Sequence, residues 1–122
     1  MEHCRRVLIV EDDGAIRSLI KFLVERERWS ADAVSDGEEA LRRILNGHYD
    51  AIVLDLMLPG VLGVAILDEV RRSAPSALST IVVVTASPAL VKKLDTTGIG
   101  AILIKPFDID ELIQAVRRCA AA

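Results

Sequence analysis

The sequence is poor in aromatic residues and has no long apolar run. Only 3% of its 122 residues are aromatic although 52% are hydrophobic, so its core must be aliphatic, which suits parallel strands covered by helices. No apolar run approaches the ~20 residues that a membrane-spanning helix needs, and the first residues lack a signal-peptide pattern. These absences argue against membrane insertion and predict a cytoplasmic location.

The sequence also has few cysteines and no excess of positive charge. Cys4 and Cys119 lie near opposite ends of the chain without metal-binding spacing, and we interpret them as ordinary thiols. The 15 Lys and Arg residues are outnumbered by 18 Asp and Glu residues, which gives a net charge of -3. Nucleic-acid binding needs clustered, uncompensated cations. We therefore expect no direct nucleic-acid binding by this domain.

The length limits how the chain is organised. A chain of 122 residues is the size of one domain and can bury roughly two-thirds of its unfolded surface. We predict a single domain over residues 1–122 and no output domain, because only Cys119 and three alanines follow Arg118. The chain is then either a stand-alone domain or a domain cut from a longer protein.

Apolar runs of strand length alternate with segments of helical period along the chain. The expected strands cover residues 7–10, 31–34, 51–54, 80–84 and 101–104. The expected helices begin near Ile16, after Asp36, near Ile66, after Pro88 and after Asp108, and the second, third and fourth end at Gly47, Pro75 and Gly98. Five strands and five helices in strict alternation predict an α/β fold with a doubly wound parallel sheet in three layers.

Polar residues follow four of the five expected strands. Glu11 and Asp12 follow the first strand, Asp55 the third, Thr85 the fourth and Lys105 the fifth. The carboxyl ends of parallel strands share one edge of the sheet, and ligands bind there. We therefore expect these side chains to converge.

The chemistry of such an edge follows from its charge. Carboxylates from Glu11, Asp12 and Asp55 repel one another, and such clusters hold either a proton or a cation. Oxygen ligands with no thiol or imidazole nearby favour a hard ion such as Mg²⁺. With a cation and Lys105 neutralising phosphoryl oxygens, Asp55 is equipped to attack phosphorus in line and to form an aspartyl phosphate.

Four motifs at the strand ends resemble the receiver domains of two-component response regulators, and the match covers nearly the whole chain. The motifs are LIVEDD at residues 8–13, IVLDLMLPG at 52–60, VTA at 84–86 and KPF at 105–107. The resemblance implies a flavodoxin-like fold with the strand order 2-1-3-4-5.

The resemblance also implies a function and residue roles. Asp55 would accept a phosphoryl group from a histidine kinase or a histidine phosphotransfer protein, and Thr85 and Lys105 would contact that group. The implied Mg²⁺ ligands are Glu11, Asp12, Asp55 and the backbone carbonyl of Met57. The domain would be a signalling phosphoacceptor rather than an enzyme, with slow autodephosphorylation, and would change its surface toward a downstream protein or output domain.

The chain departs from the family pattern in its last third. Related domains commonly carry Tyr or Phe three residues before the lysine, whereas this chain has Ile102, so the implied switch consists of Thr85 and Ile102. Gly100 and Ala101 replace two acids that one large subfamily uses for dimer contacts. The stretch between Thr85 and Lys105 is about two residues shorter than usual.

Two other functions remain open on the sequence. A phosphorylation-independent docking module would keep the fold but signal by binding alone, and Ile102 and the short fourth helical segment favour that alternative. A Mg²⁺-dependent phosphatase of the haloacid dehalogenase type also uses an Asp nucleophile. That class needs a second acid two residues after the nucleophile, where this chain has Met57.

Overall fold

The fold is described by a computed structural model that covers residues 5–58 and 62–121. Five parallel strands form one sheet in the order β2-β1-β3-β4-β5, which confirms the predicted topology. Their bounds are β1 (Arg6–Val10), β2 (Ser30–Val34), β3 (Ala51–Asp55), β4 (Ile81–Thr85) and β5 (Ala101–Ile104). Cys4, which we interpret as an ordinary thiol, and the motif residues Pro59 and Gly60 lie outside the described residues.

Helices connect each strand to the next. The α-helices of the described ranges are α1 (Gly14–Arg26), α2 (Gly37–Asn46), α3 (Gly63–Ser73), α4 (Pro88–Lys93) and α5 (Ile109–Ala121). A 3₁₀ helix, η1 (Pro75–Thr80), precedes β4 and is not predicted from the sequence. Pro75 opens it, and Thr80, predicted as the first strand residue, closes it. None of these helices is long and apolar enough to cross a membrane.

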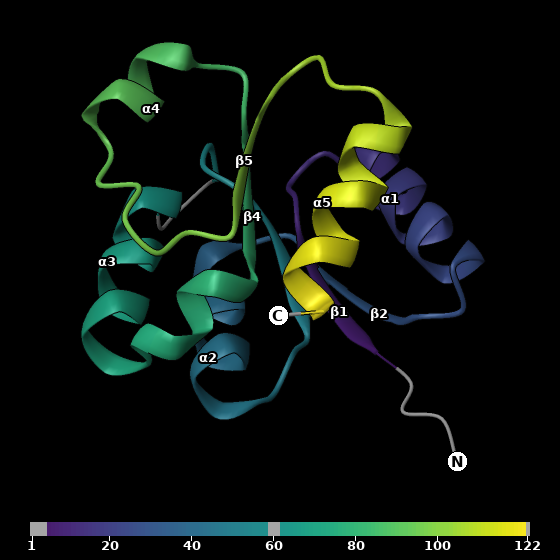
Figure 1. The fold of residues 1–122 in the computed structure, drawn as a ribbon, viewed down its shortest axis with the longest axis horizontal. Helices are drawn as coiled ribbons and strands as arrows, with labels where there is room; N and C mark the ends of the chain where they lie inside the picture. Colours follow the sequence, from purple (N-terminus) through teal and green to yellow (C-terminus); the bar gives the residue numbers. More distant parts are fainter. Residues whose placement is uncertain (1–4, 59–61, 122) are drawn as a thin grey trace.

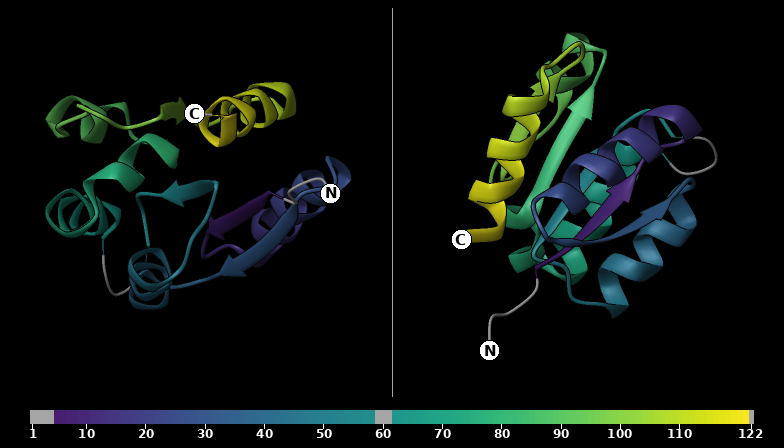
Figure 2. Two further views of the ribbon diagram at one scale, coloured as in Figure 1. Left: turned by 60° about the horizontal axis from the view of Figure 1, so that its bottom comes forward. Right: turned by 90° about the vertical axis from the view of Figure 1, so that its right-hand side faces the viewer.

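The helices cover both faces of the sheet and give the three predicted layers (Figures 1 and 2). Helices α1 and α5 lie on one face, and α2, α3 and α4 lie on the other. Successive residues of β1 alternate between the two aliphatic clusters: Leu8 and Val10 pack on the α2 and α3 side, and Val7 and Ile9 pack on the α1 and α5 side. Because both faces are covered, the central strands read as continuous apolar runs.

The register of the strands brings their carboxyl ends to one edge. Leu54 of β3 pairs with Val10 of β1 and with Val83 of β4, and Thr85 pairs with Ile104 of β5. This edge is at the top of Figure 1. The residues that follow these strands therefore emerge from neighbouring positions, as the sequence predicts.

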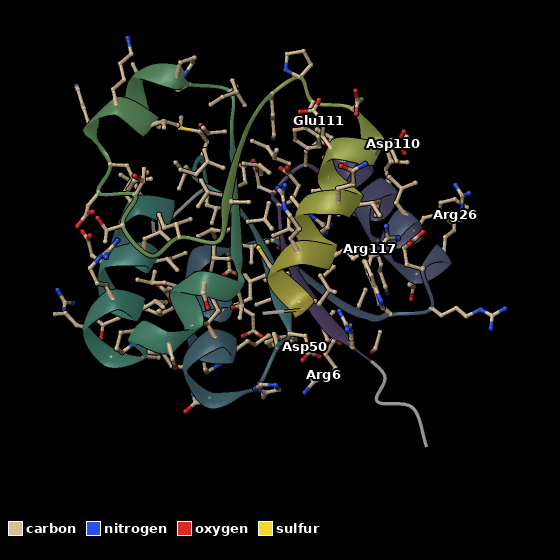
Figure 3. All side chains as sticks on the ribbon, viewed as in Figure 1. Arg6, Arg26, Asp50, Asp110, Glu111 and Arg117 are labelled. Atoms are coloured by element: carbon tan, nitrogen blue, oxygen red, sulfur yellow. The ribbon has the colours of Figure 1, made fainter. Side chains whose placement is uncertain are left out.

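The opposite edge of the sheet is held together by polar contacts. The Arg6 N–H donates to Asp50 Oδ2 at 2.8 Å, and the two residues lie side by side where β1 begins (Figure 3). The Arg6 guanidinium donates to Asp32 Oδ2 at 3.1 Å and lies 4.8 Å from the centre of the Tyr49 ring. The Tyr49 hydroxyl also donates to Asp32 Oδ2, at 2.9 Å. These contacts fasten β2 to β1 and to the segment before β3.

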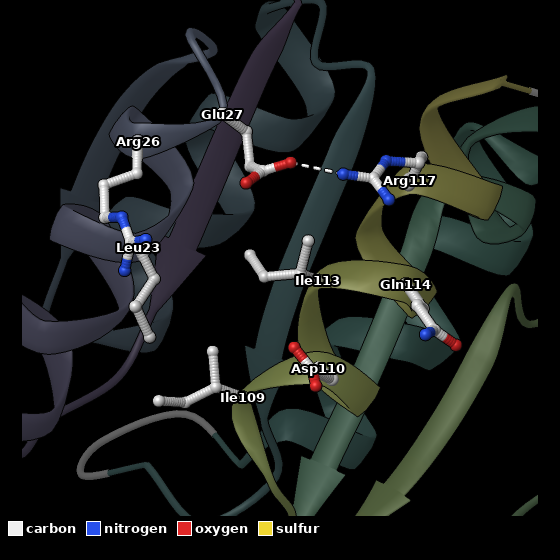
Figure 4. A pocket seen from close by; sticks show the side chains of 8 residues that line it. All are labelled: Leu23, Arg26, Glu27, Ile109, Asp110, Ile113, Gln114 and Arg117. Atoms are coloured by element: carbon white, nitrogen blue, oxygen red, sulfur yellow. Dashed lines mark hydrogen bonds and ion pairs between the residues drawn. The ribbon is translucent and has the colours of Figure 1, made fainter.

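A groove runs between α1 and α5 (Figure 4). Leu23, Ile109 and Ile113 contribute apolar side chains to it, and Arg117 forms an ion pair with Glu27 beside them. No polar residue from the strand ends lines this groove. It is therefore separate from the edge where the acidic side chains are expected.

The helix after β4 is shorter than predicted. We expected it to continue to Gly98, whereas α4 ends at Lys93 and Leu94 is already extended. Helix α4 has no fully buried residue, and only partly buried side chains such as Leu90 pack against the core. Short helices that bury so little apolar surface are marginal. Gly98 has a φ of 82°, which is a left-handed conformation. The prediction of helical structure beyond Lys93 is therefore wrong.

The residue before β5 packs too closely against its neighbours for a side chain. A Cβ atom on Gly100 would lie 2.4 Å from the Ser79 carbonyl oxygen and 2.6 Å from the Cys119 Sγ. This close packing leaves no room for a side chain at position 100. Cys119 is a buried free thiol, and burial raises the pKa of that thiol, which agrees with the interpretation of Cys119 as an ordinary thiol.

Candidate functional site

Three carboxylates converge at the carboxyl edge of the sheet. Glu11 directly follows β1, and Asp55 is the last residue of β3; both are buried, with 2% and 3% of their surface exposed. Asp12 is exposed. Ligand oxygens from the three side chains lie within 4.8 Å of one another. The predicted acidic cluster is therefore present in the structure.

Lys105 joins this cluster from the end of β5. Its Nζ lies 3.1 Å from Glu11 Oε1 and 3.0 Å from Asp55 Oδ2. The remaining oxygens of the two buried carboxylates accept backbone hydrogen bonds. Glu11 Oε2 accepts from the Asp13 N–H at 3.2 Å, and Asp55 Oδ1 accepts from the Met57 N–H at 2.8 Å. Both buried carboxylates are thus fixed in orientation.

The electrostatics of the cluster leave negative charge in excess. Burial raises the pKa of Glu11 against the lowering effect of its hydrogen bonds from Asp13 and Lys105. Burial alone would lower the pKa of Lys105, but its hydrogen bonds to Asp55 and Glu11 and their charges outweigh burial and raise that pKa. Three carboxylates facing one ammonium leave two negative charges uncompensated, and such clusters favour a divalent cation.

Gly63 sets the path of the chain after Asp55. Its N–H donates to the Leu56 carbonyl oxygen at 3.0 Å. A Cβ atom on Gly63 would lie 2.5 Å from the Leu56 Cα and 2.9 Å from the Asp55 carbonyl oxygen. Backbone atoms cannot move aside as a flexible side chain can, so glycine allows α3 to begin directly against the end of β3.

Thr85 connects the site to α4. Thr85 is fully buried, and its carbonyl oxygen accepts from the Lys105 N–H at 2.8 Å. Its hydroxyl oxygen accepts from the Ser87 N–H at 3.1 Å. The Ser87 side chain in turn caps α4 by accepting from the Leu90 N–H at 3.3 Å. The hydroxyl of Thr85 is therefore two hydrogen bonds away from the first turn of α4.

The other two predicted site residues, Ile102 and Met57, make no described side-chain contact with the cluster. Ile102 is half-buried and packs against the aliphatic core on the α2 and α3 side. Met57 is 54% exposed, and its N–H donates to Asp55 Oδ1. No described contact bears on the Met57 carbonyl, so its role as a ligand stays a prediction.

Arg17 is a contributor that the sequence analysis missed. Its Nη1 donates to the carbonyl oxygens of Glu11 at 3.0 Å and Asp12 at 3.2 Å. The helical pattern places Arg17 on the solvent side of α1, which conceals this contact. Long helical side chains point toward the N-terminus of their helix, and that rule could have indicated a reach back to the acidic residues.

The donor set of the cluster fits Mg²⁺. Mg²⁺ prefers carboxylate and carbonyl oxygens and keeps several waters, and the cluster offers carboxylates of Glu11, Asp12 and Asp55 on one open edge. A buried carboxylate beside such an ion and a lysine is suited to nucleophilic attack on phosphorus.

Comparisons with known proteins agree with this geometry. The family described as "Response regulator receiver domain" matches residues 7–117. The chain is 34% identical over 114 residues to "Response regulator ArlR" from Staphylococcus saprophyticus and 35% identical over 114 residues to "Transcriptional regulatory protein DltR" from Streptococcus agalactiae. Each match covers 92% of this chain and 50% of the relative. The chain thus spans about half the length of these relatives.

Two solved structures with the same fold contain magnesium. The receiver domain of a sensor histidine kinase from Pseudomonas aeruginosa, with a magnesium ion coordinated in its active-site cleft, has a TM-score of 0.85 and 25% identity, covering 98% of this chain and 100% of that one. The response regulator TrrA from Thermotoga maritima, in complex with Mg²⁺ and beryllium fluoride, has a TM-score of 0.84 and 31% identity, covering 94% of this chain and 98% of that one.

Proposed function

Because the chain belongs to the response regulator receiver domain family, we propose that it accepts a phosphoryl group on Asp55 from a histidine kinase or a histidine phosphotransfer protein. The observation that carries this proposal is the geometry around Asp55. Its buried carboxylate lies with Glu11 and Asp12 within 4.8 Å and contacts Lys105 at 3.0 Å. A nucleophile, a cation site and a fixed ammonium are thus combined at one edge of the sheet.

Glu11, Asp12 and Asp55 would hold the Mg²⁺ ion, with the Met57 carbonyl as the further ligand implied by the family resemblance. When bound, the ion neutralises negative charge on the phosphoryl oxygens. Two findings support this assignment: the cluster has two negative charges more than Lys105 compensates, and two similar receiver structures contain Mg²⁺.

Asp55 acts as the nucleophile. Its carboxylate oxygen bonds to phosphorus as the bond from phosphorus to the donor imidazole nitrogen breaks, and the electron pair of that bond stays on the imidazole. The Met57 N–H holds one Asp55 oxygen. Once Asp55 has become an acyl phosphate and lost its charge, Lys105 is close enough to pair with a phosphoryl oxygen. Attack by water then gives slow autodephosphorylation, so the chain is a phosphoacceptor that resets itself.

The Thr85 hydroxyl transmits the change to α4. The phosphoryl group adds about -1.5 to -2 charges at the edge and attracts this hydroxyl. Rotation of the hydroxyl removes the acceptor of the Ser87 N–H, and Ser87 is the N-cap of α4. Ile102 is β-branched and restricted in its rotamers, and it offers no large ring to bury or expose. We therefore place most of the change in α4.

The partner that reads this change would be a downstream protein or an output domain. The relatives are called a response regulator and a transcriptional regulatory protein and are about twice as long as the match. The described residues form one three-layered unit that we assign to a single receiver domain, and we propose that it works in the cytoplasm, where histidine kinases act on their response regulators.

Phosphorylation of an Asp55→Asn variant tests the proposal. The asparagine keeps the size of Asp55 but removes the attacking charge, so incubation with acetyl phosphate and Mg²⁺ should give no gain in intact mass. Asp68→Asn, on the exposed side of α3, is the control and should be phosphorylated like the parent. A mass gain in Asp55→Asn would assign the phosphoryl group to another residue, and no gain in the parent would favour the docking module.

A further inference from the structure

We infer that Arg71 clamps the segment between α4 and β5 to the end of α3, so that movement of this part of the molecule is confined to α4. The Nη1 of Arg71 donates to the Thr97 carbonyl oxygen at 2.8 Å, and its Nη2 donates to the Asp95 carbonyl oxygen at 2.9 Å. The Asp95 carboxylate lies 3.8 Å from the same guanidinium. One side chain therefore binds the segment at three points.

Arginine is suited to this task. Its planar guanidinium presents several donors in a fixed fork, so that two nitrogens can bond two acceptors at once. The Arg71 side chain is 30% exposed, whereas the side chain of its neighbour Arg72 is 71% exposed and pairs with Glu69 of the same helix. The two residues share charge and helix, but Arg71 reaches a different element.

The clamped segment, residues 94–100, has an ordered path although it contains no regular helix or strand. The Thr97 N–H donates to Asp95 Oδ1 at 3.0 Å, and the Ile99 N–H donates to the Thr96 carbonyl oxygen at 3.1 Å. The Gly100 N–H donates to the Leu78 carbonyl oxygen of η1 at 3.1 Å. These bonds depend on the backbone geometry that Arg71 holds at positions 95 and 97.

Helix α4 contrasts with this segment. It has no fully buried residue, and its N-cap is linked to the Thr85 hydroxyl by the Ser87 N–H. A displacement of Ser87 would therefore move the loosely packed α4 first, and the clamped segment that follows α4 would resist it. This second step rests on the proposed function, whereas the clamp itself is a property of the unphosphorylated chain.

The clamp is tested by amide hydrogen exchange of the unphosphorylated protein, read by NMR. In Arg71→Ala we expect the amides of Thr97 and Ile99 to exchange about tenfold faster, because they lose local protection. Arg72→Ala is the matched control and should leave both unchanged. The amides of β3 serve as an internal reference for global stability. Equal exchange of the segment in Arg71→Ala and Arg72→Ala would overturn the clamp.

The variant Arg71→Lys separates the contribution of the positive charge from that of the two-nitrogen contact. Lysine keeps an attraction to Asp95 but has one nitrogen in place of two, so we expect exchange between that of the parent and that of Arg71→Ala. This variant also decides the question if Arg71→Ala does not fold. Exchange equal to that of the parent would overturn the role of the two-nitrogen contact.

Beryllium fluoride with Mg²⁺, as a phosphoryl mimic, tests the confinement. In the parent we expect the shifts beyond the site to lie within residues 86–93, and in Arg71→Ala we expect them to extend through residues 95–100. Shifts across 95–100 already in the parent would overturn the confinement. An absence of any shift in the parent would contradict the proposed function and leave the exchange result on the clamp intact.

Discussion

The middle of the sheet and its β5 side differ greatly in how deeply their residues are buried. β3 and β4 are buried at every position and end at Asp55 and Thr85, whereas α4 has no fully buried residue and β5 is only partly buried. The free energy needed to open a segment rises with its buried contacts. The stable strands thus carry the acidic cluster, and a weakly held helix lies beside them, where a change of surface requires little free energy.

We expect the largest difference between the two regions in the free energy of unfolding that a leucine-to-alanine substitution removes from each. Leu54 of β3 is fully buried, and Leu90 of α4 is a partly buried residue packed against the same cluster. Leu54→Ala should lower the free energy of unfolding by about 2–5 kcal/mol, the range for a buried leucine. Leu90→Ala should lower it by about 1 kcal/mol or less. Urea denaturation measures both, and similar losses would remove the contrast.

A smaller effect is expected where the stable region turns into α3. In Gly63→Ala the new methyl group would meet the backbone of Leu56 at 2.5 Å, and we expect a loss of about 1–3 kcal/mol together with slower phosphorylation. In Gly14→Ala the nearest atom lies at 3.6 Å, at the end of the Arg17 side chain, so stability should change by no more than about 1 kcal/mol. Thermal unfolding of both variants would contradict this account if Gly63→Ala were as stable as Gly14→Ala.

The acidic cluster should give a gain in stability that accompanies a loss of binding. Removal of one of three repelling carboxylates in Asp12→Asn should raise the free energy of unfolding in metal-free buffer by roughly 0.5–1 kcal/mol and should weaken Mg²⁺ binding. Asp68→Asn should change neither quantity. Calorimetric titration that finds Asp12→Asn binding Mg²⁺ as tightly as the parent would remove Asp12 from the metal site.

The smallest effect concerns the edge opposite the site. The hydrogen bond from Tyr49, followed by the bond and charge of Arg6 and the charge of Arg43, holds the pKa of Asp32 below its ordinary 3.8, against the opposing effect of burial. A carboxylate whose pKa is lower in the folded than in the unfolded state stabilises the fold at pH values above its unfolded-state pKa. This stabilisation is lost as the pH falls through the folded-state pKa. The parent should therefore be more stable than Asp32→Asn at neutral pH, and the difference should shrink below about pH 4. A difference that does not change with pH would contradict this assignment.

The difference between the buried middle of the sheet and its β5 side also explains which parts of the molecule can be predicted from the sequence. Runs such as residues 51–54 are apolar at every position because both faces of the strand are covered, and the polar residue after such a run must emerge at the carboxyl edge. This reasoning predicts the parallel sheet and the convergence of Glu11, Asp55 and Lys105, whereas the strand order 2-1-3-4-5 is implied by the family resemblance. The sheet and the convergence depend on burial, which leaves a strong signal in the sequence.

The rest depends on contacts that leave no periodic signal. Helix α4 ends at Lys93 and has no fully buried residue, and the path of residues 94–100 depends on Arg71, which is 24 and 26 residues from its acceptors. Arg17 likewise reads as a solvent-facing helical residue although it holds the backbone of Glu11 and Asp12. Side-chain contacts to a distant or irregular backbone become visible only when the elements are placed in space.

The central claim is that the stable edge holds a Mg²⁺-dependent phosphoacceptor at Asp55. The most direct test is to incubate the parent chain with acetyl phosphate, with and without Mg²⁺, and to locate any phosphoryl group by intact mass and peptide mapping. We predict one phosphoryl group per chain, on the peptide that contains Asp55, and only when Mg²⁺ is present. A phosphoryl group on another peptide, or equal phosphorylation without Mg²⁺, would contradict the account.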